Sequence, residues 1–233
     1  MIVSIAQPAY LPWLGYFDRI FRSDLAVVLD HVQFERRGFT HRNRICGKNG
    51  PMWLSVPINR KGNFDMPIKD LTISNDSDWQ KKHWDSIRHA YGKTACWEQY
   101  APALEPIFRR QWTELNSLLA ESTAILFELL GISTKIIYSS AMQVSGVKNE
   151  LIVNICREAG ATEYISGPFG RDYLEQESFA QAGIAVRFHD YRHPQYPQQQ
   201  PGFVPNMSVI DLLLQHGPAS LEILTRAQEL AYV

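Results

Sequence analysis

Short apolar runs frame a helix-like segment at the start of the chain. Residues 2–6 and 25–29 are short, apolar and rich in β-branched side chains, which is typical of buried strands. The segment between them carries apolar residues at helical spacing, namely Leu14, Phe17, Ile20 and Phe21. Pro12 can open this helix, because a proline in the first turn sacrifices no intrahelical hydrogen bond. The pattern therefore predicts the order strand, loop, helix, strand.

Extended segments and then helices are predicted in the middle of the chain. Residues 34–45 and 53–58 are expected to form a β-hairpin around the turn-forming residues between them, and residues 68–73 a further strand. Asp76 or Ser77 can cap a helix that stops at Gly92. A second, long helix is predicted over residues 102–130, and it ends at Gly131. Its apolar residues recur at helical spacing, which indicates core packing rather than chemistry.

Strands and helices alternate in the next part of the chain. Strands are predicted at residues 135–138, 164–167 and 185–188, and helices at residues 148–160 and 171–182. Such alternation is typical of a parallel sheet with right-handed crossovers. We therefore expect a single α/β domain over residues 1–233. Its largely parallel central sheet would carry an inserted basic β-hairpin and a helical middle segment, residues 76–131.

A long loop and a last helix complete the predicted fold. Residues 190–206 combine prolines, glutamines and aromatic residues without periodicity, and loops of this length tend to be functional or disordered. If this loop closes as a lid, Tyr196 and Gln198 are predicted to contact the ligand. Ser208 can cap the last helix, and Asp211 lies in its first turn. Asp211 is predicted either to anchor the lid or to serve an ordinary capping role.

Composition and charge narrow the class of protein. The chain has 233 residues, of which 45% are hydrophobic and 20% charged, and this excludes disorder, collagen-like repeats and coiled coil. A net charge of −1 gives no overall attraction to nucleic acid or anionic membranes, so nucleic-acid binding is not expected and any anion site must be local. The three cysteines form no CxxC pair, and we expect reduced thiols. No signal segment or membrane span is recognised, which predicts a cytoplasmic protein.

The turn from the first strand into the first helix, residues 7–17, is one candidate site. Ligands bind at this junction in open α/β sheets, because free backbone N–H groups and the helix dipole point into the crevice. Gln7 supplies an amide at the end of the strand, and Gly15 would let a ligand approach closely. A structural turn whose aromatic residues pack into the core is the alternative.

A locally basic segment, residues 30–44, is a second candidate. Arginine side chains bind carboxylate or phosphate with two parallel hydrogen bonds. On an extended strand, Arg36, Arg42 and Arg44 would share one face with Phe34, and Arg37, Phe39 and Asn43 the other. A solvated charged strand and an RNA-binding strand are the alternatives.

Histidines form a third group. His83 lies on a predicted helix, and His189 and His193 have a spacing that could offer metal ligands, but no third ligand stands at a fixed distance. Hydrogen-bonded or surface histidines are the interpretation that we favour. The patterns of Walker, Rossmann and α/β-hydrolase sites are absent.

Motifs spread over nearly the whole chain resemble the WbqC-like protein family. They are Ile5-Ala6-Gln7-Pro8, residues 12–17, Asp30-x-Val32-Gln33-Phe34, Arg37-x-x-x-x-Arg42-Asn43-Arg44-Ile45, Lys82-His83-Trp84 with Tyr91, Tyr196-x-Gln198, and residues 208–213 with Gly217. One position departs from the family, because His31 stands where a second acidic residue commonly follows Asp30. Members are bacterial proteins often encoded among genes for O-antigen and other surface polysaccharides.

The resemblance implies work on sugars or their nucleotide-linked precursors. We expect an enzyme that modifies an amino sugar or a nucleotide-linked sugar by acyl or aminoacyl transfer, or by ATP-dependent amide formation. The cofactor is left open, and ATP with Mg²⁺ is the candidate for the second reaction. A non-catalytic sugar- or nucleotide-binding accessory protein is the alternative. His83 is predicted to assist proton transfer. The predicted substrate contacts are Gln7, Tyr16, Asp30, Gln33, Arg37, Arg42, Asn43, Arg44, Tyr196, Gln198 and Asp211, and the predicted cofactor contacts are Gln7, Gly15 and Tyr16.

A more distant similarity concerns the phosphate site. The opening of the chain is similar to that of nucleotidylyltransferases and pantothenate synthetase, where a His-x-Gly-His motif contacts ATP phosphates. Residues 13–16 occupy that place here, and neither histidine is present. Phosphate would then be stabilised by Tyr16, the helix N-terminus and the arginine segment. Residues 166–173 are similar in arrangement to a nucleotide loop at a strand end. Convergence of Gln7, the arginine segment and His83 on one pocket would favour an enzyme, and separate locations a binding protein.

Overall fold

A twisted, mainly parallel β-sheet lies at the centre of the fold. The computed structural model describes residues 1–59, 66–226 and 231–232. The strands of this sheet are β1 (Ile2–Ala6), β2 (Leu25–Val28), β5 (Lys135–Tyr138), β6 (Glu163–Ser166), β7 (Ala185–Phe188) and β8 (Ala231–Tyr232). Their order is β5-β2-β1-β6-β7-β8, and all neighbours are parallel except β7 and β8. The predicted α/β class with a largely parallel sheet is confirmed.

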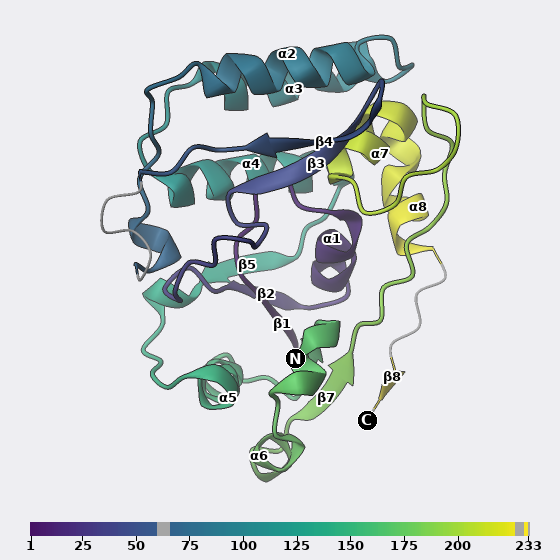
Figure 1. The fold of residues 1–233 in the computed structure, drawn as a ribbon. Helices are drawn as coiled ribbons and strands as arrows, with labels where there is room; N and C mark the ends of the chain where they lie inside the picture. Colours follow the sequence, from purple (N-terminus) through teal and green to yellow (C-terminus); the bar gives the residue numbers. More distant parts are fainter. Residues whose placement is uncertain (60–65, 227–230, 233) are drawn as a thin grey trace.

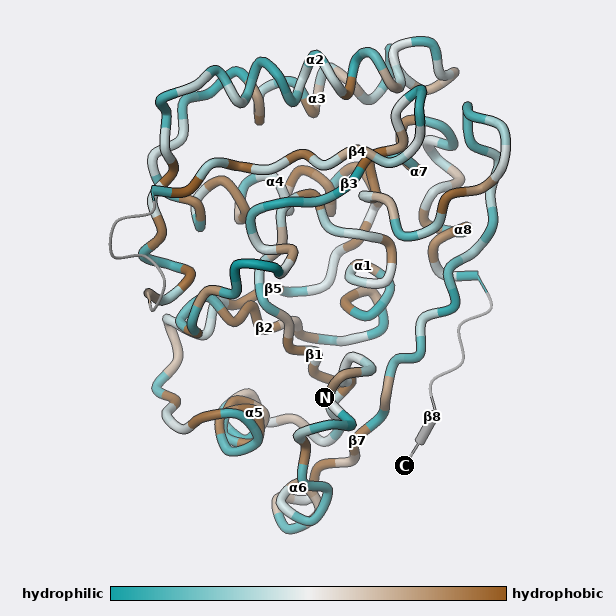
Figure 2. The backbone as a smooth tube through the Cα atoms, viewed as in Figure 1, coloured by the Kyte–Doolittle hydropathy of each residue, from teal (hydrophilic) through white to brown (hydrophobic). Residues whose placement is uncertain are grey.

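Helices cover both faces of this sheet. On one face lie α1 (Leu14–Phe21) and α4 (Leu115–Leu130), and on the other α5 (Lys148–Glu158) and α6 (Gln176–Gln181) (Figure 1). Side chains alternate across a strand, so Val3 and Ile5 of β1 pack with α5, whereas Ala6 lies against the opposite core. Because both faces are covered, β2 is apolar along its whole length and β1 is apolar at every position except Ser4 (Figure 2).

The strand order reverses next to β1. The chain passes from β1 to β2 and later to β5 on one side, and then returns to place β6 and β7 on the other side of β1. The carboxyl ends of β1 and β6 therefore border a crevice. In open α/β sheets, ligands bind at such a topological switch point.

A separate layer covers the helices of one face. The antiparallel strands β3 (Arg42–Gly47) and β4 (Gly50–Ser55) form the predicted hairpin, and α2 (Trp79–Tyr91) and α3 (Trp97–Arg109) lie beyond it (Figure 1). Trp84 stacks on Trp97 and Phe108, which holds the two helices together.

Two extended segments were wrongly predicted in this region. Residues 34–41 form turns rather than a strand, and the guanidinium of Arg42 donates to the carbonyl oxygens of Arg37 and Gly38. The expected strand 68–73 begins as the short 3₁₀ helix η1 (Ile68–Asp70), and isolated bridges follow it.

The long helix predicted over residues 102–130 is two helices, α3 and α4. At the break, the backbone N–H of Ile73 donates to the carbonyl oxygen of Thr113, and the backbone N–H of Leu115 donates to that of Leu71. These bonds join the segment between α3 and α4 to a remote part of the chain, while the indole N–H of Trp112 donates back to the carbonyl oxygen of Ile107 in α3. The helix predicted over residues 171–182 is also shorter, because the 3₁₀ helix η3 (Pro168–Asp172) precedes α6.

The C-terminal part follows the prediction more closely. After β7, residues 189–207 form no helix or named strand, and Ser208 caps α7 (Val209–His216) by accepting the N–H of Ile210. A further helix, α8 (Ser220–Thr225), follows, so α7 is not the last. Within the described part of the chain, every helix is too short or too polar to span a bilayer.

Candidate functional site

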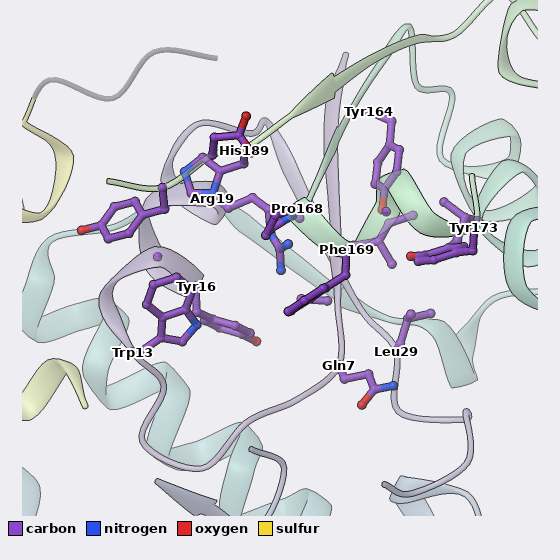
Figure 3. A pocket seen from close by; sticks show the side chains of 18 of the residues that line it. Gln7, Trp13, Tyr16, Arg19, Leu29, Tyr164, Pro168, Phe169, Tyr173 and His189 are labelled. Carbon is purple, nitrogen blue, oxygen red and sulfur yellow. The ribbon is translucent and has the colours of Figure 1, made fainter. Parts of the chain in front are cut away.

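A cavity of about 610 Å³ opens at the carboxyl ends of β1, β6 and β7. We call it the switch-point cavity. Gln7 follows β1 and lines the cavity from below in Figure 3, while Tyr16 and Arg19 reach the cavity from α1. Residues 167–170 follow β6, and His189 follows β7. Segments far apart in the sequence therefore meet at the position where this fold class binds ligands.

The first turn of α1 forms one wall. Arg19 follows Tyr16 by three residues and Gly15 by four, so all three border the cavity from one side of α1. A Cβ atom on Gly15 would lie 2.4 Å from the indole of Trp13. The close approach that Gly15 permits is therefore made by the indole of Trp13, which also lines the cavity.

Two arginines line the cavity, Arg19 from α1 and Arg192 from the segment after β7. The guanidinium of Arg19 points toward Pro168 and Phe169 at the centre of the labelled side chains (Figure 3). A Cβ atom on Gly167 would lie 2.3 Å from Nη1 of Arg19, so a glycine at this position makes room for the guanidinium. Nε is buried without a hydrogen-bond partner, and no acceptor among the described residues pairs with the guanidinium. A guanidinium that pairs with no carboxylate is available to an incoming anion.

Three tyrosines share the environment of Arg19. Burial raises the pKa of Tyr16, Tyr164 and Tyr173, and the nearby guanidinium of Arg19 lowers each pKa in part. The phenols therefore stay protonated near neutral pH and can donate hydrogen bonds. Together with the guanidinium, they give the cavity donors that suit an anionic or hydroxyl-rich ligand.

Phe169 lies at the mouth of this cavity and is 80% exposed. A phenylalanine with so much of its ring in water gains little from folding. An exposed ring beside a cavity is a natural platform for the flat face of a base or a sugar.

A buried acid–histidine pair completes the wall. Oδ2 of Asp18 on α1 lies 2.6 Å from Nε2 of His189 and 2.8 Å from Nε of Arg22. The carboxylate is fully buried, and His189 is 3% exposed. The charge of Asp18 is compensated by Arg22, which is only partly exposed.

A second, apolar cavity of about 470 Å³ adjoins the first at Tyr16, which lines both. Its other walls come from β2, β5 and α4 and include Pro8, Val28, Leu119, Ala120, Ala124, Ile136 and Tyr138. The small side chains of Ala120 and Ala124, one turn apart on α4, leave this space open.

The predicted contacts divide between this site and other places. Gln7, Gly15 and Tyr16 line the switch-point cavity. Asp30 does not: it is buried and accepts hydrogen bonds from the hydroxyl groups of Ser139 and Ser140 and from the backbone N–H of Ser140. These bonds tie the end of β2 to the segment after β5.

Arg42 and Arg44 of the arginine segment lie on the hairpin, and none of the arginines of residues 30–44 lines the cavity. The guanidinium groups of Arg42 and Arg44 lie over the ring of Trp53, 4.5 and 5.5 Å from its centre. Asn43 is buried and donates to the carbonyl oxygen of Leu11, while Arg37 is exposed. Gln33 is also exposed, and it forms an isolated bridge with Pro67.

His83 is likewise outside the switch-point cavity. Its Nδ1 lies 2.9 Å from the hydroxyl group of Tyr10, and a shallow depression between β4 and α2 borders the ring. Burial lowers the pKa of His83 to about 4, so the ring is neutral near pH 7. These contacts hold α2 against the turn after β1.

The loop residues and Asp211 form a buried cluster of their own. The carboxylate of Asp211 accepts hydrogen bonds from the hydroxyl groups of Tyr91 and Tyr196 and from the amide of Gln198. Asp211 and Tyr196 are 0% and 5% exposed. The loop is thus packed onto α7 in this structure, and its two predicted ligand contacts are used internally.

The described residues offer few metal ligands. Among them, no group of three or more histidine, cysteine or carboxylate side chains could hold a metal ion. His189 is turned toward Asp18, and Nδ1 of His193 lies beside the carbonyl oxygen of Pro194.

Comparison with known proteins places the chain in a family. The model of the WbqC-like protein family matches residues 7–223. The chain belongs to this family. Among curated relatives, this WbqC-like protein is 36% identical to "Uncharacterized protein Rv1507c" of Mycobacterium tuberculosis over 217 residues. The aligned stretch covers 92% of this chain and 94% of the relative. No solved structure matches it.

Sequence reasoning missed the centre of this site. Arg19 was not singled out, although it follows Gly15 by four residues and so shares its helical face. The contacts of Arg19 with Gly167, and of Asp18 with His189, join segments remote in the sequence. The predicted turn at residues 7–17 and the loop at residues 166–173 did point to this edge, because the carboxyl ends of parallel strands meet there.

Proposed function

We propose that this WbqC-like protein binds a nucleotide-linked sugar in the switch-point cavity and acts in the biosynthesis of bacterial surface polysaccharides such as O-antigen. One observation carries the proposal: the guanidinium of Arg19 lies in the cavity without a partner among the described residues. A diphosphate offers the paired oxygens that a guanidinium binds best. The proposal includes a cytoplasmic location.

The remaining walls support the same ligand. The phenols of Tyr16, Tyr164 and Tyr173 can donate to phosphate or sugar oxygens, and the amide of Gln7 both donates and accepts. Phe169 offers a stacking surface at the mouth. A cavity of about 610 Å³ lies in the range of small-molecule and cofactor sites.

Acyl transfer to an amino group of this sugar is the reaction that we propose. The apolar cavity at Tyr16 supports it, because an apolar acyl group would be buried there beside the polar ligand. Two features support the rival function, a non-catalytic binding protein: His83 and the arginines of the hairpin do not lie at the cavity. The reaction therefore depends on groups other than those first predicted.

Titration calorimetry with UDP and UDP-N-acetylglucosamine tests the binding step. Arg19→Gln should weaken both by about tenfold or more, because a charge-assisted contact contributes about 1.5–3 kcal/mol. Arg88→Gln is the matched control, since Arg88 is exposed on α2 and pairs with Asp85. Arg42→Gln tests the alternative that the arginines of the hairpin, rather than Arg19, bind the diphosphate. Equal affinity for wild type and Arg19→Gln, or a loss confined to Arg42→Gln, would contradict the proposal.

A further inference from the structure

The buried pair of Asp18 and His189 has the geometry of an oriented base. The 2.6 Å contact between the carboxylate and Nε2 fixes the plane of the imidazole ring. The backbone N–H of His189 donates to the carbonyl oxygen of Ser166, which fixes the main chain at the end of β7. The ring lines the switch-point cavity at the edge nearest Arg19 (Figure 3). A histidine held at both points can present its second ring nitrogen in one direction only.

The contact with Asp18 also selects the tautomer. Because the carboxylate accepts, Nε2 carries the proton, and Nδ1 keeps a lone pair. Among the described residues, only Asp18 hydrogen-bonds to the ring, so Nδ1 is left for a ligand. A carboxylate that orients an imidazole, with the second nitrogen open to the substrate, is the arrangement that makes histidine an effective proton acceptor.

The buried charge of Asp18 does not require His189 as a partner. Arg22 already pairs with the same carboxylate oxygen at 2.8 Å, and Oδ1 of Asp18 is buried without a partner. Asp190 and Tyr191, from the segment after β7, also lie beside the ring, and Arg19 and Arg192 line the same cavity. Asp190 is engaged by both terminal nitrogens of Arg171. The contact of Asp18 with His189 is therefore additional to the ion pair that neutralises the carboxylate.

We propose that His189 is the proton acceptor of the switch-point cavity and that Asp18 is its positioning residue; this rests on the proposed function. The amino group of the bound sugar attacks the carbonyl carbon of a thioester donor. The C–N bond forms, and the C–S bond breaks. The proton lost by the nitrogen passes to Nδ1 of His189 and then to the departing thiolate. The products are an amide and a thiol, and no oxidant or reductant is needed.

The test uses UDP-glucosamine as the acceptor and acetyl-coenzyme A as the thioester. Mass spectrometry should detect the N-acetylated nucleotide sugar with wild-type protein. His189→Gln should lower the rate by about 10²–10⁴-fold. Its Kd for UDP should stay within about threefold of wild type. His89→Gln is the matched control, because His89 is exposed on α2 and does not line the cavity.

Asp18 needs a readout that a purely structural role would not move. Asp18→Asn keeps the shape of the side chain but no longer favours the tautomer of His189 with Nε2 protonated. We therefore expect a lower rate and also a shift of the acid limb of the pH–rate profile. A second measurement needs no variant: diethyl pyrocarbonate should modify His189 in wild-type protein, and UDP should protect it while leaving His89 reactive.

The outcomes separate the two proposals. Failure of wild-type protein to bind UDP would overturn the proposed function. If UDP binds, then a wild-type rate in His189→Gln, absence of the acetylated product from wild-type protein, or modification of His189 that UDP does not slow would each overturn the role of His189 and leave the binding site standing.

Discussion

Gly167→Ala perturbs the anion site without changing any charge. Gly167 has φ −68° and ψ 167°, an ordinary extended conformation that alanine adopts freely. The new methyl group would lie 2.3 Å from Nη1 of Arg19, so the guanidinium has to leave its position. Since that group is the end of a flexible side chain, the fold should tolerate the change. We expect the free energy of unfolding to stay within about 1 kcal/mol of wild type.

The loss should appear in binding. If the displaced guanidinium no longer reaches a phosphate, one charge-assisted contact of about 1.5–3 kcal/mol disappears, which is about tenfold to a hundredfold in Kd. Titration calorimetry with UDP measures it, and urea unfolding checks stability. The variant Arg19→Gln/Gly167→Ala supplies the control: both changes remove the same contact, so the double variant should bind about as weakly as Arg19→Gln alone. Wild-type affinity in Gly167→Ala, or losses that simply add in the double variant, would refute the placement of Arg19.

Two further predictions concern residues outside the cavity. The folded pKa of His83 is about 4, against 6.5 for a histidine side chain free in water, so protons bind the unfolded chain first and stability present above pH 6.5 is lost as the pH falls toward 4. Between pH 7.5 and 5 the free energy of unfolding should fall by about 2 kcal/mol through this group. Urea unfolding of His83→Gln should lack this fall, UDP binding should be intact, and an unchanged pH dependence of stability would contradict the lowered pKa of His83. Asp211→Asn should cost about 2–4 kcal/mol in the same assay, because Tyr91 and Tyr196 donate to different carboxylate oxygens and the single amide oxygen cannot accept from both; a loss below about 0.5 kcal/mol would show that the cluster is not structural.

Local sequence patterns predicted most of the central sheet. The strands 2–6, 135–138 and 185–188 were predicted with the bounds of β1, β5 and β7, because buried parallel strands are short apolar runs separated by helices. The prediction of one helix over residues 102–130 was wrong for a tertiary reason, since the backbone at the break forms hydrogen bonds with the remote residues Leu71 and Ile73. Such contacts leave no local periodicity.

The candidate site was predictable to a smaller extent. Gln7 and Tyr16 were identified because the first strand–helix turn is defined by adjacent residues. The arginines of the hairpin were selected for charge alone, and charge does not reveal that Trp53 lies beneath two of them. The positions of Gly167 and His189 beside α1 depend on the strand order, which a single sequence leaves open.

A crystal structure of the protein with UDP-N-acetylglucosamine tests the central claim most directly. We predict diphosphate oxygens within about 3.2 Å of the guanidinium of Arg19, between the ends of β1 and β6. Phe169 should lie against the base or the sugar. A diphosphate bound instead at Arg42 and Arg44 on the hairpin, with Arg19 still unpaired, would contradict the account.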